Sequence, residues 1–354
     1  MNRSPQADVL VVGGYGAVGS IVTREVAVRT PGHVIVSGRD LVAAESLARQ
    51  FGNARAAHLD LADPRSLARV LEEFPVKVVV LAVEPDNAEP SRMCVERGVH
   101  VVDVSASAGL LTHTERLHDL AVKHDATALL SVGLAPGLTN VLARRALDSL
   151  PESHRIDITI LLGGGEEHGK DAIRWTVRQL QAPSPDTKAG SLKVWLPGFG
   201  VRRAHPFPFS DQVTLRRTLP IAQASTRMCF DSATVTALVF GAQRAGVFRL
   251  ARGPRALAAL TALIGGVHAG SDRYVVRVDA HDAEGQHVWH AVTGNRQSLA
   301  TGRVAAAATV RLLTGELPPG VHHLDQLHQF HQLPEDLAPA LQVWQGSPRP
   351  NPSH

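Results

Sequence analysis

The chain of 354 residues has only two cysteines, Cys94 and Cys229, and no long apolar run. Two cysteines cannot build a disulfide framework, so we expect a reducing compartment, the cytoplasm. The longest apolar stretch, residues 256–267, is too short to span a bilayer and contains Thr261 and a pair of glycines, so we expect no membrane segment. The first predicted strand begins within about ten residues of Met1, which leaves no room for a signal peptide.

Charge is also scarce. Charged residues make up 19% of the chain, the net charge is +3, and the basic residues form no continuous tract. Proteins that bind nucleic acid carry a stripe of lysine and arginine, so we expect no nucleic-acid partner. A hydrophobic content of 44% is typical of a folded protein. The chain is too long for one ordinary core, which predicts two domains.

Glycines follow the first apolar run. Val9–Val12 has the composition of a buried parallel strand, and Gly14, Gly16 and Gly19 then have the spacing G-x-G-x-x-G, with Gly13 before them. In a dinucleotide-binding turn such glycines allow a tight bend, a close approach of backbone to pyrophosphate, and close packing of helix on strand. The following helix would direct its N-terminal N–H groups at the phosphates. A glycine-rich loop without a nucleotide is the alternative. The cofactor-binding residues predicted here are Gly13, Gly14, Tyr15, Gly16, Ala17 and Val18.

The second predicted strand, Val34–Ser37, ends in Ser37-Gly38-Arg39. An NAD site usually has an acidic residue at this point to bind the ribose 2′-hydroxyl. A hydroxyl and a guanidinium instead suit a 2′-phosphate, so we predict NADP(H) rather than NAD(H), bound by Ser37, Gly38 and Arg39. Arg39 could equally be a solvated arginine. Asp40 lies beyond the usual acidic position and could cap the helix expected over 41–51.

Strands and helices keep alternating to about residue 133. We expect strands at 56–59, 76–83, 99–104 and 128–132, with helices at 63–73 and 90–97 between them. This pattern predicts an α/β fold, a Rossmann doubly wound parallel sheet, in which ligands lie beyond the carboxyl ends of the strands. Asp60 lies near the expected adenine position or, alternatively, at a helix N-terminus. The strand ends predicted to line the cofactor groove are Asp60, Leu61, Ala82, Val83, Ser105 and Ala106.

The pattern changes from about residue 134. Polar and apolar residues alternate over 155–162, which predicts an antiparallel strand with one solvated face. A helix is expected at 171–181. Proline- and glycine-rich connections are expected to about residue 217. We expect further strands at 233–240, 274–279 and 288–292 and an apolar helix at 255–264. This would be a second, α+β domain for substrate binding and dimerisation.

An alanine-rich helix at 297–313 is expected to return to the first domain. The predicted dinucleotide-binding domain is therefore discontinuous, 1–133 plus about 298–330, with the α+β domain at 134–297 and a solvated tail at 331–354. His322, His323, His328 and His331 match no strong zinc pattern, so we expect no metal and treat them as part of a frayed end.

Two segments carry a family resemblance. Cys94, Gly98 and Asp103 precede Gly133, Pro136-Gly137 and Asn140, and the closing helix is followed by Gly315 and Pro319-Gly320-Val321. This arrangement resembles the saccharopine dehydrogenase family, well over the first domain, moderately at the closing segment and loosely over about 145–295.

The resemblance implies a two-domain reductase, usually a homodimer. Such enzymes use NAD(P)H on the C=N bond of an imine formed from an amine and an oxo acid or aldehyde, or run the reverse reaction. Saccharopine reductases commonly have Asp where this chain has Ala135, an acidic residue near Ser131, and a Ser-Tyr pair where it has Ser105-Ala106. These departures put saccharopine itself in doubt as the substrate, and they do not touch cofactor binding.

Hydride transfer needs few protein groups, but an imine substrate of the amino or oxo acid class needs cations and a proton donor. The loop and helix after a triple glycine supply His168, Lys170 and Arg174, with Glu167 beside them. His168 could equally be a surface histidine and Arg174 a surface arginine. His205 and Asp211 are weaker candidates. The alternative function is a non-catalytic NADP(H)-binding sensor. A short-chain dehydrogenase is excluded, because Tyr15 and Tyr274 are the only tyrosines and neither starts a Tyr-x-x-x-Lys motif.

Overall fold

The structure is a computed structural model that describes residues 8–166, 170–181, 190–250, 253 and 270–347. The chain divides into two compact units. Unit 1 comprises residues 1–138 and 298–333, and unit 2 comprises residues 139–297 and 334–354.

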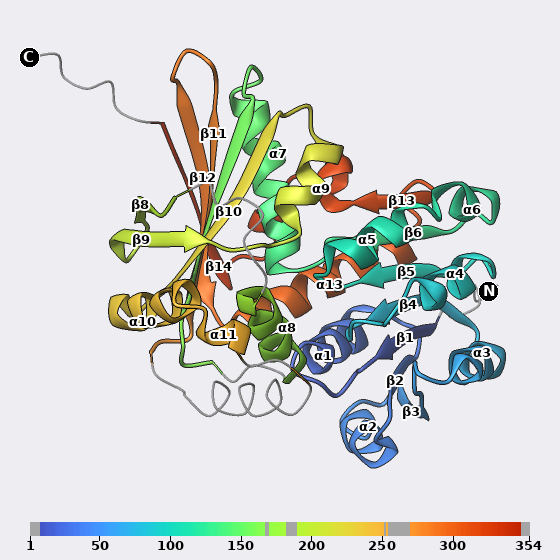
Figure 1. Ribbon diagram of the computed structural model, residues 1–354. Coiled ribbons are helices and arrows are strands. Elements are labelled where there is room, and N and C mark those ends of the chain that lie inside the picture. Colours follow the sequence, from blue (N-terminus) through green and yellow to red (C-terminus); the bar gives the residue numbers. More distant parts are fainter. Residues whose placement is uncertain (1–7, 167–169, 182–189, 251–252, 254–269, 348–354) are drawn as a thin grey trace, which may run out of the picture. The chain divides into compact units, whose positions relative to one another are not determined.

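Unit 1 contains a parallel sheet of seven strands in the order β13-β6-β5-β4-β1-β2-β3 (Figure 1). Strands β1 to β3 run toward one edge and β4 to β6 toward the other. The chain therefore reverses its winding between β1 and β4, and ligands of such sheets lie beyond the carboxyl ends of the strands at that point. The strands are β1 (Asp8–Val12), β2 (Val34–Gly38), β3 (Ala54–His58), β4 (Val76–Leu81), β5 (His100–Asp103), β6 (Thr127–Leu130) and β13 (Gly320–His323).

The central strands of this sheet are buried because their sequences are continuous runs of β-branched and other apolar residues. Val9–Val12 and Val78–Leu81 are at most 2% exposed. The parallel order of these strands confirms the predicted Rossmann fold class. The helices of unit 1 are α1 (Gly19–Arg29), α2 (Leu41–Ala48), α3 (Pro64–Glu73), α4 (Glu89–Val95), α5 (Ala108–Glu115), α6 (His118–Lys123) and α13 (Gln297–Leu313).

Helix α13 has the bounds expected from its alanine-rich sequence, and it packs on α1. A Cβ at Gly302 would lie 2.6 Å from Ile21 Cγ2, and Arg303 Nε lies 3.0 Å from Glu25 Oε1. The chain then enters β13, which pairs with β6, so in Figure 1 the red strand lies beside the teal one. Residues far apart in the sequence thus complete one sheet.

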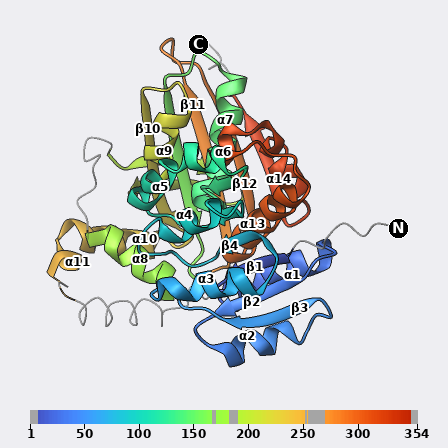
Figure 2. The ribbon, with the colours of Figure 1, turned by 90° about the vertical axis from the view of Figure 1, so that its right-hand side faces the viewer.

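Unit 2 contains a mixed sheet in the order β14-β12-β11-β7-β10-β9-β8. Only β7 and β10 are parallel neighbours, and helix α7 packs on β11 and β12 (Figure 2). The strands are β7 (Arg155–Leu162), β8 (Leu192–Leu196), β9 (Gly200–Pro206), β10 (Gln223–Phe230), β11 (Arg273–His281), β12 (His287–Asn295) and β14 (Leu341–Gly346), and the helices are α7 (Thr139–Ser149), α8 (Lys170–Gln181), α9 (Asp211–Thr218), α10 (Ala233–Arg244), α11 (Val247–Leu250) and α14 (Leu333–Asp336).

Several expectations for unit 2 are wrong. Strand β7 has no solvated face, because its six central residues are all buried. It pairs antiparallel with β11, as expected, but parallel with β10. The region expected to be connections contains β8, β9 and α9. Residues 233–240, expected as a strand, form helix α10, which begins where the Ser232 side chain accepts a hydrogen bond from the Val235 N–H. The apolar helix expected at 255–264 lies outside the described residues.

The tail expected at 331–354 is also wrong over its described part. Strand β14 pairs along its whole length with β12, so its backbone hydrogen bonds are made within the sheet. His323 is only 3% exposed because it lies at the end of β13, in the sheet of unit 1.

Candidate functional site

The turn between β1 and α1 is built for glycine. Gly13 has a φ of +73°, which a residue with a side chain rarely adopts. A Cβ at Gly19 would lie 2.1 Å from the Gly13 carbonyl oxygen, and one at Gly14 would lie 2.9 Å from the Val11 oxygen. Gly16 and Ala17 are exposed at the tip. The backbone of this turn therefore lacks the side chains that would keep a dinucleotide pyrophosphate away from it.

Helix α1 begins at this turn without a charge of its own at the N-terminus. No side chain caps its first residues, and no acidic residue lies in its first turn. The partial positive charge of the helix end is therefore not neutralised locally, and that end favours an anion. The residues present fit a dinucleotide whose pyrophosphate lies here.

The carboxyl end of β2 carries the residues that distinguish the two nicotinamide cofactors. Arg39 is exposed, and its side chain makes no hydrogen bond or ion pair with any residue that the structure describes. Asp40 accepts a hydrogen bond from Ala43 N at 3.0 Å and so caps α2, as its alternative role predicted. Ser37 is buried and donates its hydroxyl to the Val11 oxygen at 3.1 Å. Its hydroxyl is used inside the sheet, so we leave Ser37 out of the phosphate site.

Tyr15 forms the wall between the glycine turn and the end of β2. A Cβ at Gly38 would lie 2.6 Å from the Tyr15 ring, so glycine at 38 allows the ring to pack there. The Tyr15 hydroxyl accepts a hydrogen bond from Asp40 N at 2.8 Å. The predicted residues Tyr15, Gly38 and Arg39 are thus brought together.

Asp60 lies in a tight turn after β3. Its Oδ1 atom accepts a hydrogen bond from Ala62 N at 3.0 Å, and α3 is capped by Asp63. The helix-capping alternative for Asp60 is therefore wrong, and its role near adenine stays a prediction. Leu61 is half-buried against the core of unit 1.

The loops after β4 and β5 are tied together at the carboxyl edge of the sheet. Val83 lies against Gly13, where an added Cβ would meet its Cγ1 atom at 2.4 Å. The Glu84 carboxylate accepts hydrogen bonds from Ala106 N and Ser107 N, each at 3.1 Å, and from the Ser107 hydroxyl. Sequence reasoning missed Glu84. The predicted residues Val83 and Ala106 therefore lie on loops that support each other.

Asp103 ends β5 in the interior. Its Oδ1 atom accepts a hydrogen bond from Ser105 N at 2.9 Å. Neither Asp103 Oδ2 nor the buried Ser105 hydroxyl makes a hydrogen bond of good geometry with a described residue. Burial raises the pKa of Asp103 to about 6, and hydrogen bonding from Ser105 opposes this only in part. Unsatisfied buried polar atoms of this kind are rare, and a ligand or water commonly explains them.

A chain of three polar side chains ends at β6. The Ser131 hydroxyl lies 2.8 Å from His323 Nδ1, and His323 Nε2 lies 2.9 Å from Glu115 Oε1. Ser131 has a φ of +54°, and it is fully buried. Sequence reasoning missed this chain, because Ser131 and His323 are 192 residues apart and His323 was expected in a frayed end.

The candidates in unit 2 are less well defined. His168 and Glu167 lie outside the described residues, and Lys170 is the first residue of α8. Arg174 is exposed on the same helix. The catalytic roles of His168, Lys170 and Arg174 therefore stay predictions. His205 is buried against the Phe240 ring, with ring centroids 4.5 Å apart, and burial lowers its pKa.

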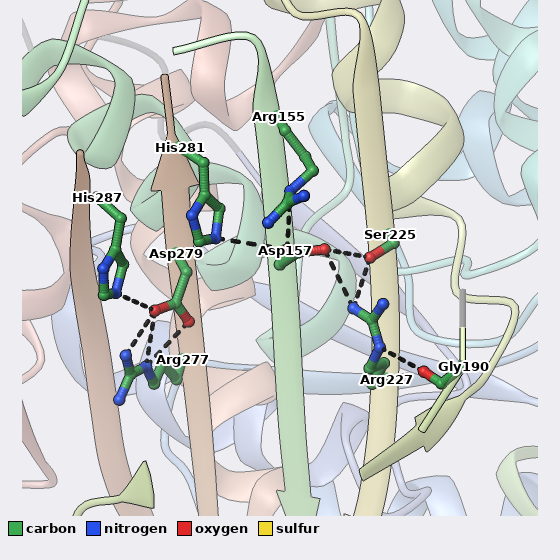
Figure 3. A network of polar contacts seen from close by, with 9 residues as sticks. All are labelled: Arg155, Asp157, Gly190, Ser225, Arg227, Arg277, Asp279, His281 and His287. Atoms are coloured by element: carbon green, nitrogen blue, oxygen red, sulfur yellow. Dashed lines mark hydrogen bonds and ion pairs between the residues drawn. The ribbon is translucent and has the colours of Figure 1, made fainter. Parts of the chain in front are cut away.

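A network of charges crosses the sheet of unit 2 (Figure 3). Asp157 accepts hydrogen bonds from the Ser225 hydroxyl and from Arg227 Nη1, and it also contacts Arg155 and His281. Its burial favours the neutral acid, but hydrogen bonds from His281 and Ser225 and the charges of Arg227 and Arg155 outweigh this and lower its pKa.

A second group lies beside the first on β11 and β12. The Asp279 carboxylate pairs with the Arg277 guanidinium and lies 3.1 Å from His287 Nε2. Arg277 also donates to the Trp195 oxygen at 2.8 Å. Because these guanidinium groups are paired with acids of the same unit, we do not assign them to a substrate carboxylate.

A comparison with known protein families supports a dinucleotide cofactor at the turn between β1 and α1. Residues 9–129 match the family model described as saccharopine dehydrogenase NADP binding domain. This part of the chain is thus similar to an NADP-binding domain of the saccharopine dehydrogenase family. The match supports an NAD(P) cofactor and a saccharopine dehydrogenase-like oxidoreductase, in agreement with the resemblance of the sequence.

The fold of the saccharopine dehydrogenase type extends over nearly the whole chain. The structure of apo saccharopine dehydrogenase (L-Glu forming) from Saccharomyces cerevisiae matches with a TM-score of 0.68 and 17% identity, over 96% of this chain and 100% of that chain. Serine dehydrogenase from Escherichia coli matches with a TM-score of 0.27 and 18% identity, over 36% of this chain and 85% of that one. The first match shows a common fold, a Rossmann-like sheet with a second mixed sheet.

Two further observations concern the part of the chain that the structure describes. It contains no helix that is long and apolar enough to cross a bilayer. Among the same residues, no group of three or more His, Cys, Asp or Glu side chains is placed to hold a metal ion.

Proposed function

We propose that the protein is an NADP(H)-dependent oxidoreductase acting on a C–N bond. In this proposal it reduces an imine, formed from an amine or amino acid and an oxo acid or aldehyde, or runs the reverse reaction. The observation that carries the cofactor choice is the exposed, unpaired Arg39 at the end of β2, where no acidic side chain takes the ribose position. The saccharopine dehydrogenase NADP-binding domain supports the reaction class.

The residues of this chain divide the work of cofactor binding. The glycine turn gives the pyrophosphate backbone N–H groups and the end of α1, and Arg39 gives the 2′-phosphate a bidentate cation. Val83 and the loop held by Glu84 form the edge beyond which the nicotinamide would lie. The bound cofactor supplies or accepts the hydride.

A titration of tryptophan or nicotinamide fluorescence with NADPH and NADH tests the proposal. Arg39→Ala removes a charged hydrogen-bonding partner, which is worth about 1.5–3 kcal/mol, and exposure favours the lower end. We therefore expect the dissociation constant for NADPH to rise about tenfold or more and that for NADH to stay unchanged.

Arg49→Ala is the matched control, because Arg49 is an exposed arginine just after α2 with the same charge. It should leave both dissociation constants within about twofold of wild type. Equal loss of NADPH and NADH affinity in Arg39→Ala would overturn the 2′-phosphate role. Absence of binding by either cofactor would overturn the whole proposal.

A non-catalytic NADP(H) sensor is the second candidate. Ala106 and Ala135 stand where saccharopine reductases commonly carry Tyr and Asp, so two polar groups of that site are missing. Saturating NADPH binding without oxidation of NADPH, over a panel of amines paired with oxo acids or aldehydes, would favour this function.

A homodimer, a small amino or oxo acid substrate and a reducing, cytoplasmic compartment remain predictions of this proposal. Sedimentation of the purified protein with and without NADPH checks the first of them. The substrate panel checks the second.

A further inference from the structure

The chain Glu115–His323–Ser131 runs from the surface of unit 1 to its interior. The Glu115 side chain is 26% exposed, His323 is 3% exposed and the Ser131 side chain is fully buried. Each neighbour lies within hydrogen-bond distance, at 2.9 Å and 2.8 Å. The three groups can therefore pass a proton inward by successive hydrogen-bond exchange.

The carboxylate of Glu115 decides which histidine nitrogen carries the hydrogen. An ionised carboxylate can only accept, so it fixes the hydrogen of neutral His323 on Nε2. Nδ1 then accepts from the Ser131 hydroxyl. An acid that orients an imidazole, which in turn acts on a hydroxyl, is the arrangement by which proteins activate such a hydroxyl.

The backbone at Ser131 is held in an uncommon conformation. A φ of +54° is disfavoured for a residue with a side chain, and such strain persists where the surroundings hold it in place. The hydrogen bond to His323 is one of those restraints. The surrounding contacts, and not a regular strand or helix, therefore fix the position of the Ser131 hydroxyl.

This hydroxyl lies at the edge of the sheet where ligands are expected. Ser131 directly follows β6, whose neighbour β5 ends at Asp103. Asp103 Oδ2 and the Ser105 hydroxyl are buried there and lack a described partner of good geometry. These unsatisfied atoms are an independent sign that a polar ligand or ordered water completes this edge.

We propose that Glu115, His323 and Ser131 form a proton relay that serves the reaction at the carboxyl edge of the unit 1 sheet. The proposal rests on the proposed imine reduction. From the state with hydrogen on Nε2 and an ionised Glu115, the balanced step is amine oxidation: the carbon gives a hydride to NADP⁺, the nitrogen gives its proton to Ser131 Oγ, the Ser131 hydroxyl proton moves to His323 Nδ1, and the Nε2 proton moves to Glu115. Imine reduction is the reverse. It starts with a protonated Glu115 and hydrogen on Nδ1, and the nitrogen takes the Ser131 proton as the carbon receives the hydride from NADPH.

In this relay Ser131 is the inner proton donor, and His323 and Glu115 are positioning residues that act through it. His323→Gln keeps a hydrogen-bonding side chain and cannot carry a proton between two atoms. We expect kcat for NADPH oxidation with an amine and oxo-acid pair to fall about 100-fold, the usual size of a lost proton transfer, with NADPH affinity within about threefold of wild type.

His322→Gln is the matched control, because His322 is the preceding residue of the same strand and its ring lies beside the Pro319 oxygen and the His118 ring, outside the chain of Glu115, His323 and Ser131. It should keep kcat within about threefold of wild type.

Two substitutions at Ser131 separate the hydroxyl from the backbone strain. Ser131→Ala removes the hydroxyl and keeps a side chain at positive φ, whereas Ser131→Gly removes the hydroxyl and relieves the strain. A relay predicts the same loss of kcat in both. Recovery of kcat in Ser131→Gly would show that only the backbone conformation matters, and it would overturn the relay.

A readout other than activity uses ¹⁵N NMR of histidine-labelled wild-type protein, with the His323 signals assigned by their loss in His323→Gln. The relay requires hydrogen on Nε2 and an accepting Nδ1 whose shift changes in Ser131→Ala. Hydrogen found on Nδ1 would overturn it, whether or not the variants fold. Active wild type with unchanged kcat in His323→Gln would overturn the relay alone. Wild type that binds NADPH and never oxidises it would overturn the proposed function together with the relay.

Discussion

Removing the charge of Asp157 should destabilise unit 2 strongly. Asp157 is 7% exposed and lies 3.1 Å from Arg227, which is 8% exposed, so Asp157→Asn leaves a buried cation without its acid. Breaking such a pair costs about 3–5 kcal/mol. Arg227 keeps hydrogen bonds to the Ser225 hydroxyl and the Gly190 oxygen, which places the cost at the lower end. The Arg155 side chain is 43% exposed and adds little. We expect a loss of about 3 kcal/mol.

Urea unfolding followed by tryptophan fluorescence measures this loss, because Trp175, Trp195, Trp289 and Trp344 all belong to unit 2. For a unit of this size, about 3 kcal/mol corresponds to a melting point lower by roughly 6–12 °C. Asp148→Asn is the control: its carboxylate is half exposed and lies 3.9 Å from Arg144, so the change should stay within about 0.5 kcal/mol.

The pH dependence has a definite sign. The folded protein lowers the pKa of Asp157, so the carboxylate contributes stability above the unfolded value of about 4. That contribution declines as the pH falls below about 4 toward the folded pKa. The difference between wild type and Asp157→Asn should therefore be largest near neutral pH and shrink at pH 3. A difference under about 0.5 kcal/mol at pH 7, or one that stays constant down to pH 3, would refute the reasoning.

Two more expectations follow from local geometry. Gly19→Ala should weaken NADPH binding more than tenfold, because its Cβ would lie 2.1 Å from the Gly13 oxygen, and Gly52→Ala, with nothing within 4 Å, should not; equal titration curves for the two variants would contradict this. Burial raises the thiol pKa values of Cys94 and Cys229 to about 12, so a thiol-disulfide reagent at pH 8 should label neither cysteine before unfolding, and rapid labelling of native protein would show that they are accessible.

The parallel sheet of unit 1 could be predicted because its signals are local. Val9–Val12 is apolar throughout, and the G-x-G-x-x-G spacing follows directly after it. Helix α13 is predicted by its run of alanines. Tyr15, Gly38 and Arg39 were found in the same way, from the order of residues along one strand–helix–strand segment.

The features that were missed depend on partners distant in the sequence. The alternation of β7 correctly marks Arg155 and Asp157 as polar positions, but water does not satisfy Asp157: Arg227 and His281 on neighbouring strands do. The valine and threonine of residues 233–240 favour a strand, but these residues form helix α10, and Ser232 caps its N-terminus. The chain from Ser131 to His323 has no local signature.

The return of β13 to β6 has a consequence for the order of assembly. When residues 1–138 have left the ribosome, β6 is an open edge whose backbone groups on one side await a partner. That partner arrives only with residues 320–323, after all of residues 139–297 have been synthesised. Unit 2 can therefore begin to fold while the sheet of unit 1 is still incomplete. The pairing of β13 with β6 then closes a long loop, which slows folding.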